Sequence, residues 1–156
     1  MKIKTDFITN SSSSSFLVVY DALPESVEEL KKVLFGERKE FPSPYTDDYW
    51  PTEEIARIVF AETRTALEGE VLEFFTGVVG DFNTSDRFRN KTGMIDWEAC
   101  LKWELEEGRK ALQAFKESHA GKVFCIYEFS DDTSLGSAME HGNVFKRVEN
   151  MRLSKH

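Results

Sequence analysis

Five consecutive serines, residues 11–15, constrain this chain more than any other feature because they separate two strand-like segments. Residues 2–7 alternate between polar and less polar side chains, which is typical of a half-exposed strand, and residues 16–20 are a continuous apolar run. Serine hydroxyls bond to nearby backbone groups and so compete with regular structure. The pattern leaves two alternatives open: the serines form a turn between two strands of a hairpin, or they continue one long strand. A phosphate-binding concavity normally depends on glycines, and the run contains none.

The opening from Phe7 to Phe16 reads Phe-Ile-Thr-Asn, five serines and Phe. It resembles a loose group of uncharacterised bacterial and bacteriophage proteins that share a Phe-x-x-Asn-(Ser)5-Phe start. Residues 140–145 and 151–156 extend the resemblance. It implies a bacterial or phage source and carries no activity with it.

Length and composition indicate one folded domain over residues 1–156, since 40% of the residues are hydrophobic. The net charge is −8, and no basic stripe runs along the chain, so we expect no nucleic-acid partner. No segment is long and apolar enough for a signal peptide or a membrane helix, which predicts a cytoplasmic protein with no membrane partner. The two cysteines, Cys100 and Cys125, are expected to be unpaired.

Helix signals are clear in three places. A first helix should begin near residues 24–27 and stop before Gly36; a second should begin with Thr52 as its cap and run to Gly80, with a break near Gly69. A third helix, residues 96–119, has its large apolar side chains three or four residues apart, which predicts a buried stripe facing a sheet. That stripe consists of Trp97, Leu101, Leu105, Gly108, Leu112, Phe115 and His119. Gly108 within it indicates close approach to another backbone.

Residues 123–127 are apolar at both parities and predict a central strand, whereas residues 144–153 mix in charges and suit an edge strand. The connection over residues 130–143 is expected to be an elaborated loop or a short helical turn. The order of elements predicts the α+β class: a small mixed or antiparallel sheet of three to four strands, covered by about three helices.

Residues 37–51 combine prolines with large aromatic side chains and predict a long ordered loop. Such a loop is either a binding surface or a segment packed beneath the neighbouring helices. The candidate interaction residues are Phe41, Tyr45, Tyr49 and Trp50.

Residues 131–141 hold the best candidates for chemistry, because carboxylates and an imidazole together can bind a divalent metal. The residues are Asp131, Asp132, Glu140 and His141. Adjacent residues such as Glu140 and His141 diverge on a strand or helix, and only an irregular loop would aim both at one ion. We therefore expect no metal site and no cofactor here, and we keep a metal-assisted hydrolase that uses these residues as the alternative.

No nucleophile elbow, triad or glycine-rich phosphate loop is present in the sequence. The sequence is best interpreted as a small cytoplasmic interaction or accessory domain without catalysis of its own. Its partner would be another protein or a second copy, with a homodimer as the simplest assembly. The biological process, the partner's identity and any substrate are not encoded in a pattern that we can interpret.

Overall fold

The computed structural model describes residues 12–80 and 84–155. The chain forms two compact units: one from residues up to Thr65 together with those from Lys122 onward, and one from Ala66 to Gly121. Helices and two antiparallel sheets make up the described residues, so the predicted α+β class is confirmed. The strand expected at residues 2–7 lies outside the described residues.

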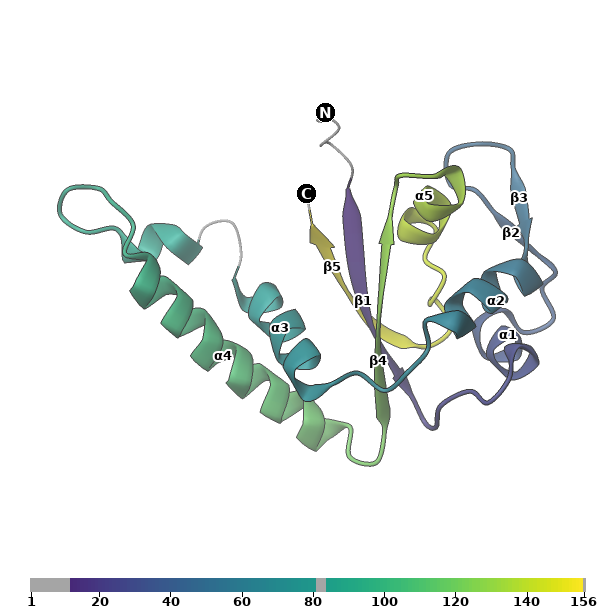
Figure 1. The fold of residues 1–156 in the computed structure, drawn as a ribbon, viewed down its shortest axis with the longest axis horizontal. Helices are drawn as coiled ribbons and strands as arrows, with labels where there is room; N and C mark the ends of the chain where they lie inside the picture. The colour runs from purple at the N-terminus through teal and green to yellow at the C-terminus, as the bar shows by residue number, and fades with distance from the viewer. Residues whose placement is uncertain (1–11, 81–83, 156) are drawn as a thin grey trace. The chain divides into compact units, whose positions relative to one another are not determined.

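A three-stranded antiparallel sheet forms the centre of the first unit (Figure 1). Its strands are β1 (Ser13–Tyr20), β4 (Val123–Ser130) and β5 (Glu149–Lys155), in the order β4-β1-β5. The prediction that residues 123–127 form the central strand is wrong, because β4 is an edge strand. β1 takes the central position, and its residues from Ser14 to Tyr20 are all buried. The edge position expected for the last strand is confirmed.

The last three serines of the run continue the strand; residues 1–11, on which the choice between a hairpin and one long strand also depends, lie outside the described residues. Ser13, Ser14 and Ser15 belong to β1, with Ser14 opposite Phe129 on one side and Ser154 on the other. Since side chains alternate along a strand, Ser14 shares a face with Phe16, and Ser15 points to the opposite face.

Three helices cover one face of this sheet: α1 (Val27–Phe35), α2 (Thr52–Ala61) and α5 (Ser134–His141). Their apolar side chains pack with alternate residues of β1 and β4, which form one contiguous core. The core includes Phe16, Val18, Leu30, Leu34, Ile55, Val59, Tyr127, Met139 and Phe145.

The ends of α1 follow the sequence prediction: the Ser26 side chain accepts a hydrogen bond from Glu29 N, and Gly36 follows the last residue with a φ of 61°. For α2 the predicted cap is wrong. Thr52 is the first helical residue, and its buried hydroxyl donates to the Arg38 carbonyl at 2.7 Å. The loop predicted over residues 37–51 contains a short hairpin, β2 (Glu40–Pro42) with β3 (Tyr49–Pro51).

A chain of hydroxyl groups crosses the core of the first unit. The Tyr127 hydroxyl lies 2.9 Å from the Tyr20 hydroxyl and 2.7 Å from Thr63 Oγ1, which donates to the Val59 carbonyl. Burial raises the pKa of Tyr20 to about 12 and raises the pKa of Tyr127 as well, because the charged phenolate is poorly solvated there.

These raised values predict loss of stability in alkali. The neutral, buried tyrosines contribute their full stabilisation of the folded state below the unfolded-state pKa of about 10. This stabilisation is lost as pH rises from about 10 to about 12, because the unfolded chain releases its phenolic protons first. Urea unfolding across that range should show a falling free energy of unfolding. Tyr127→Phe should make the fall shallower, and an unchanged slope would contradict this assignment.

The second unit pairs α3 (Glu68–Val79) with α4 (Trp97–Ser118), and the 3₁₀ helix η1 (Thr84–Phe88) precedes α4. The rings of Phe75 and Phe115 lie 5.2 Å apart, and Lys116 Nζ lies 2.7 Å from Glu68 Oε1. Gly80 follows α3, as the sequence predicted.

The predicted burial stripe of α4 is wrong in its first half. Trp97 and Leu101 are 58% and 59% exposed and Leu105 is 37% exposed, whereas Cys100, Gly108 and Leu112 are buried. The buried face is the one that carries small residues, because helices that approach closely leave no room for large side chains. The predicted close approach at Gly108 is confirmed: an added Cβ would lie 2.7 Å from Thr76 Oγ1 and 3.1 Å from Thr76 Cα.

This contact predicts opposite effects for two glycine-to-alanine substitutions. Alanine normally stabilises a helix by up to about 1 kcal/mol relative to glycine, and Gly69→Ala should do so, since nothing lies within 4 Å of its added Cβ. Gly108→Ala should instead destabilise by about 1–3 kcal/mol, because it overpacks the contact with α3. Thermal unfolding of both variants measures this, and stabilisation by Gly108→Ala would show that the helices are further apart.

Candidate functional site

A group of polar residues lies where β1 begins, β4 ends and α5 ends. We call Ser12, Ser14, Asp131, Glu140 and His141 the polar cluster. The backbones of Ser12 and Asp131 hold the strand ends together, since Asp131 N donates to the Ser12 carbonyl at 3.1 Å. Ser12 N in turn donates to Asp131 Oδ1 at 2.9 Å. The extended serine run thus positions the first acidic side chain of the cluster.

Glu140 is the unusual member of the polar cluster, because its side chain is completely buried. Ser12 Oγ lies 2.8 Å from Glu140 Oε1 and 3.0 Å from Asp131 Oδ2. Ser14 Oγ lies 3.5 Å from the same Oε1. The other carboxylate oxygen, Glu140 Oε2, is buried and has no hydrogen-bond partner in the part of the chain that the structure describes. A buried acceptor without a donor is costly, commonly by about 1–3 kcal/mol.

His141 completes the polar cluster. Its Nε2 lies 3.5 Å from Glu140 Oε1, and its ring meets the ring of Tyr45 edge to face at 5.4 Å. One ligand atom each from Asp131, Glu140 and His141 can be chosen so that all three lie within 4.8 Å of one another.

The sequence argument expected the side chains of Glu140 and His141 to diverge on a helix, whereas the structure places His141 Nε2 3.5 Å from Glu140 Oε1. His141 is the last residue of α5, and its long side chain reaches back toward the carboxylate. Asp132, the fourth predicted residue, is not part of this three-residue group, and its Oδ2 lies 3.0 Å from Ser130 Oγ. The contribution of the serines was missed, because no local pattern links residue 12 to residue 140.

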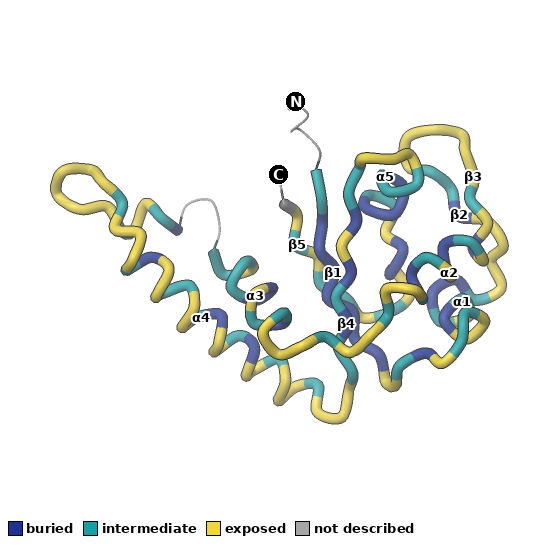
Figure 2. The backbone as a smooth tube through the Cα atoms, viewed as in Figure 1, coloured by how far each residue is buried: buried dark blue, intermediate teal, exposed yellow. Residues whose placement is uncertain are grey.

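The four predicted aromatic residues of the hairpin fall into two pairs. Phe41 is buried, packs edge to face on Phe35 at 5.9 Å, and occupies the space that a Cβ on Gly142 would fill. Trp50 packs partly buried against the core, and its Nε1 has no hydrogen-bond partner among the described residues. Tyr45 and Tyr49 are 68% and 61% exposed. Tyr45 belongs to the segment between β2 and β3, which is drawn mostly in yellow in Figure 2, and Tyr49 is the first residue of β3.

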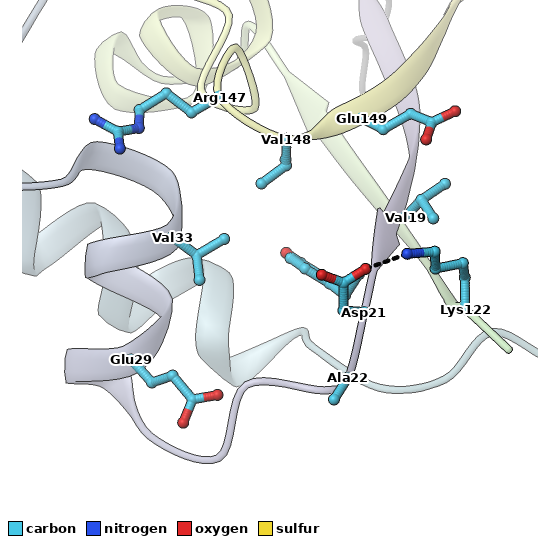
Figure 3. A pocket seen from close by; sticks show the side chains of 10 residues that line it. Val19, Asp21, Ala22, Glu29, Val33, Lys122, Arg147, Val148 and Glu149 are labelled. Atoms are coloured by element: carbon cyan, nitrogen blue, oxygen red, sulfur yellow. Dashed lines mark hydrogen bonds and ion pairs between the residues drawn. The ribbon is translucent and has the colours of Figure 1, made fainter. Parts of the chain in front are cut away.

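An open cavity of about 450 Å³ lies between α1 and the sheet edge (Figure 3). Its lining carries both charge signs: Asp21, Glu29 and Glu149 against Lys122 and Arg147. Lys122 is paired with Asp21, as the dashed line in Figure 3 marks. The lining therefore holds three acids against two bases and does not present a single charge sign.

Comparisons of the chain with protein-family models, curated proteins and solved structures give no match. Among the described residues, no helix has the length and apolar character needed to cross a membrane. Functional inference therefore depends on the residues themselves.

The contacts of Ser12 predict that removing its hydroxyl lowers the stability, whereas removing the hydroxyl of the neighbouring Ser13 does not. Ser12→Ala should cost about 1–3 kcal/mol, because Glu140 Oε1 loses its shorter hydroxyl contact inside a buried site. Ser13→Ala is the matched control, since Ser13 makes no side-chain hydrogen bond within the described residues, and it should change stability by less than about 0.5 kcal/mol. Equal effects of the two substitutions in chemical denaturation would contradict the pairing.

Proposed function

We propose that the protein is an interaction domain that self-associates through the exposed apolar side chains of α4. We call Trp97, Leu101 and Leu105 the α4 stripe. They follow one another at intervals of four residues and therefore lie along one side of the helix. Their exposed fractions are 58%, 59% and 37%.

The observation that supports this proposal is that three large apolar side chains share one solvent-facing helix surface. Single exposed apolar residues are ordinary, but a contiguous group marks an interaction site more often than chance. An apolar helix face of this kind is commonly covered by another helix or by a groove. Tryptophan is also enriched among residues that dominate binding energy.

A second copy is the partner that the charges favour. Exposed residues of both charge signs flank the α4 stripe, Glu98 and Lys102 among them, so two copies would not bring a single charge sign together. A two-fold interface uses the same patch on both subunits, and dimers of this kind are the commonest assemblies.

The hairpin predicted from sequence is the second candidate surface, favoured by the exposure of Tyr45 and Tyr49. Its tip also carries the exposed acids Asp47 and Asp48. A second copy would meet like charge there, so this surface suits a partner with basic side chains. The anchoring residues Phe41 and Trp50 would hold the hairpin in place.

Sedimentation and light scattering test the two surfaces against each other. The wild type should reach twice the 18.0 kDa mass of one chain as its concentration rises. Trp97→Ser with Leu101→Ser should raise the dissociation constant at least about tenfold, equal to about 1.4 kcal/mol. The helical circular dichroism should stay unchanged, because both side chains are largely exposed in one chain.

Tyr45→Ser with Tyr49→Ser is the matched control and should leave self-association unchanged. A wild type that stays monomeric at every concentration would refute the second-copy proposal. Loss of association in the tyrosine variant alone would move the interface to the hairpin.

A further inference from the structure

We propose that the polar cluster is a binding site for a divalent transition-metal ion, with Asp131, Glu140 and His141 as its protein ligands. The three side chains come from the end of β4 and the last turn of α5. One ligand atom of each lies within 4.8 Å of the others. Around a tetrahedral zinc ion, ligands at about 2.0–2.2 Å lie roughly 3.5 Å apart, so binding would draw these atoms together by roughly 1 Å.

The first reason is the hydrogen-bond inventory of the polar cluster. Ionised carboxylates only accept, and a serine hydroxyl has one proton to donate. Ser12 Oγ lies within hydrogen-bond distance of an oxygen of Glu140 and of an oxygen of Asp131, and its one proton serves only one of them. The two carboxylates therefore share fewer donors than their oxygens require.

The second reason is Glu140 Oε2, which is buried on a side chain with no exposed surface and has no hydrogen-bond partner within residues 12–80 and 84–155. Taking a carboxylate out of water costs several kcal/mol unless a positive charge or donors replace the water. Among the described residues, neither Glu140 nor Asp131 forms an ion pair with a lysine or arginine. Arg152 donates its Nε hydrogen to Ser14 Oγ at 3.1 Å instead of pairing with either acid. A bound cation would supply the missing positive charge.

The chemistry of the ligands points to the class of ion. Imidazole nitrogen suits Zn²⁺, Fe²⁺, Co²⁺ and Ni²⁺, whereas sites for Mg²⁺ and Ca²⁺ are built from oxygen alone. Two carboxylates and one imidazole leave a fourth position for water or for Ser12 Oγ on a tetrahedral ion. The edge of the Tyr45 ring against His141 restrains the orientation of the imidazole.

Calorimetric titration of the chelator-treated full-length protein with ZnCl₂ tests the proposal, with MgCl₂ as the comparison. The wild type should bind one Zn²⁺ per chain saturably, and Mg²⁺ should give no saturable heat. Asp131→Asn and His141→Ala should each weaken Zn²⁺ binding at least about tenfold. Asp132→Asn is the matched control: it removes a neighbouring carboxylate outside the three-residue group, and binding should stay unchanged.

Co²⁺ provides an independent readout, because its visible absorption intensifies in a four-coordinate site and should be lost in His141→Ala. Circular dichroism of each variant without metal separates lost binding from lost folding. Since the α4 stripe is not involved, failure of this test leaves the association proposal standing, and the reverse also holds.

Two results would overturn the proposal. One is the absence of saturable Zn²⁺ binding by the wild type. The other is Zn²⁺ binding that Asp132→Asn weakens as much as His141→Ala does, since this would indicate scattered surface carboxylates. If Glu140→Gln also raises the thermal stability of a protein that binds no Zn²⁺, the carboxylate is a buried polar group without a ligand.

Discussion

The side-chain hydrogen bonds of Ser12, which directly precedes β1, and of Ser14 within it are the constraint on which the rest of the first unit depends. A central strand has a neighbour on each side, so its backbone groups are satisfied, but polar side chains inside it still need partners. Ser12 and Ser14 find theirs in Asp131 and Glu140. The same contacts bring the end of β4 and the end of α5 to one place. On one face of β1, the serine that contacts the polar cluster's carboxylates is therefore followed directly by side chains of the apolar core.

The aromatic side chains of β1, and not its serines, select the register. Because residues 11–15 are all serines, a slip of one residue against β4 would still leave serine hydroxyls on the face of the carboxylates. The same slip would turn Phe16 away from the rings of Phe129 and Phe145 and would break the hydrogen bond between the Tyr20 and Tyr127 hydroxyls. The serines therefore supply donors to the carboxylates in the register that the aromatic contacts fix.

Local signals in the sequence predicted much of the fold, and the failures have physical causes. Helix ends depend on nearby residues such as Ser26 and Gly36, so α1 could be placed closely. The stripe of α4 was assigned to the side with the largest apolar residues, whereas close packing against α3 selected Cys100 and Gly108 because they are small. Apolar periodicity alone does not say which of two adjacent stripes will be covered.

The candidate site was predictable in its residue types and not in its geometry. Asp131, Glu140 and His141 could be named from the sequence, because few imidazoles and acids lie so close along the chain. Their convergence depends on α5 forming where a loop or a short helical turn was expected, and on serines more than a hundred positions earlier. Pairings of that separation have no local signature.

The position of β1 in the chain has a consequence for how the protein is made. Tyr20 pairs with Val123, about 100 residues later, and β5 follows later still. At roughly 5 to 20 residues per second, the apolar segment of β1 leaves the ribosome roughly 5 to 20 seconds before its first partner strand is complete. During that interval both of its edges are open to pairing with other chains. The serines next to this segment are poor formers of strand aggregates, so they limit that exposure on one side while the protein is still unfinished.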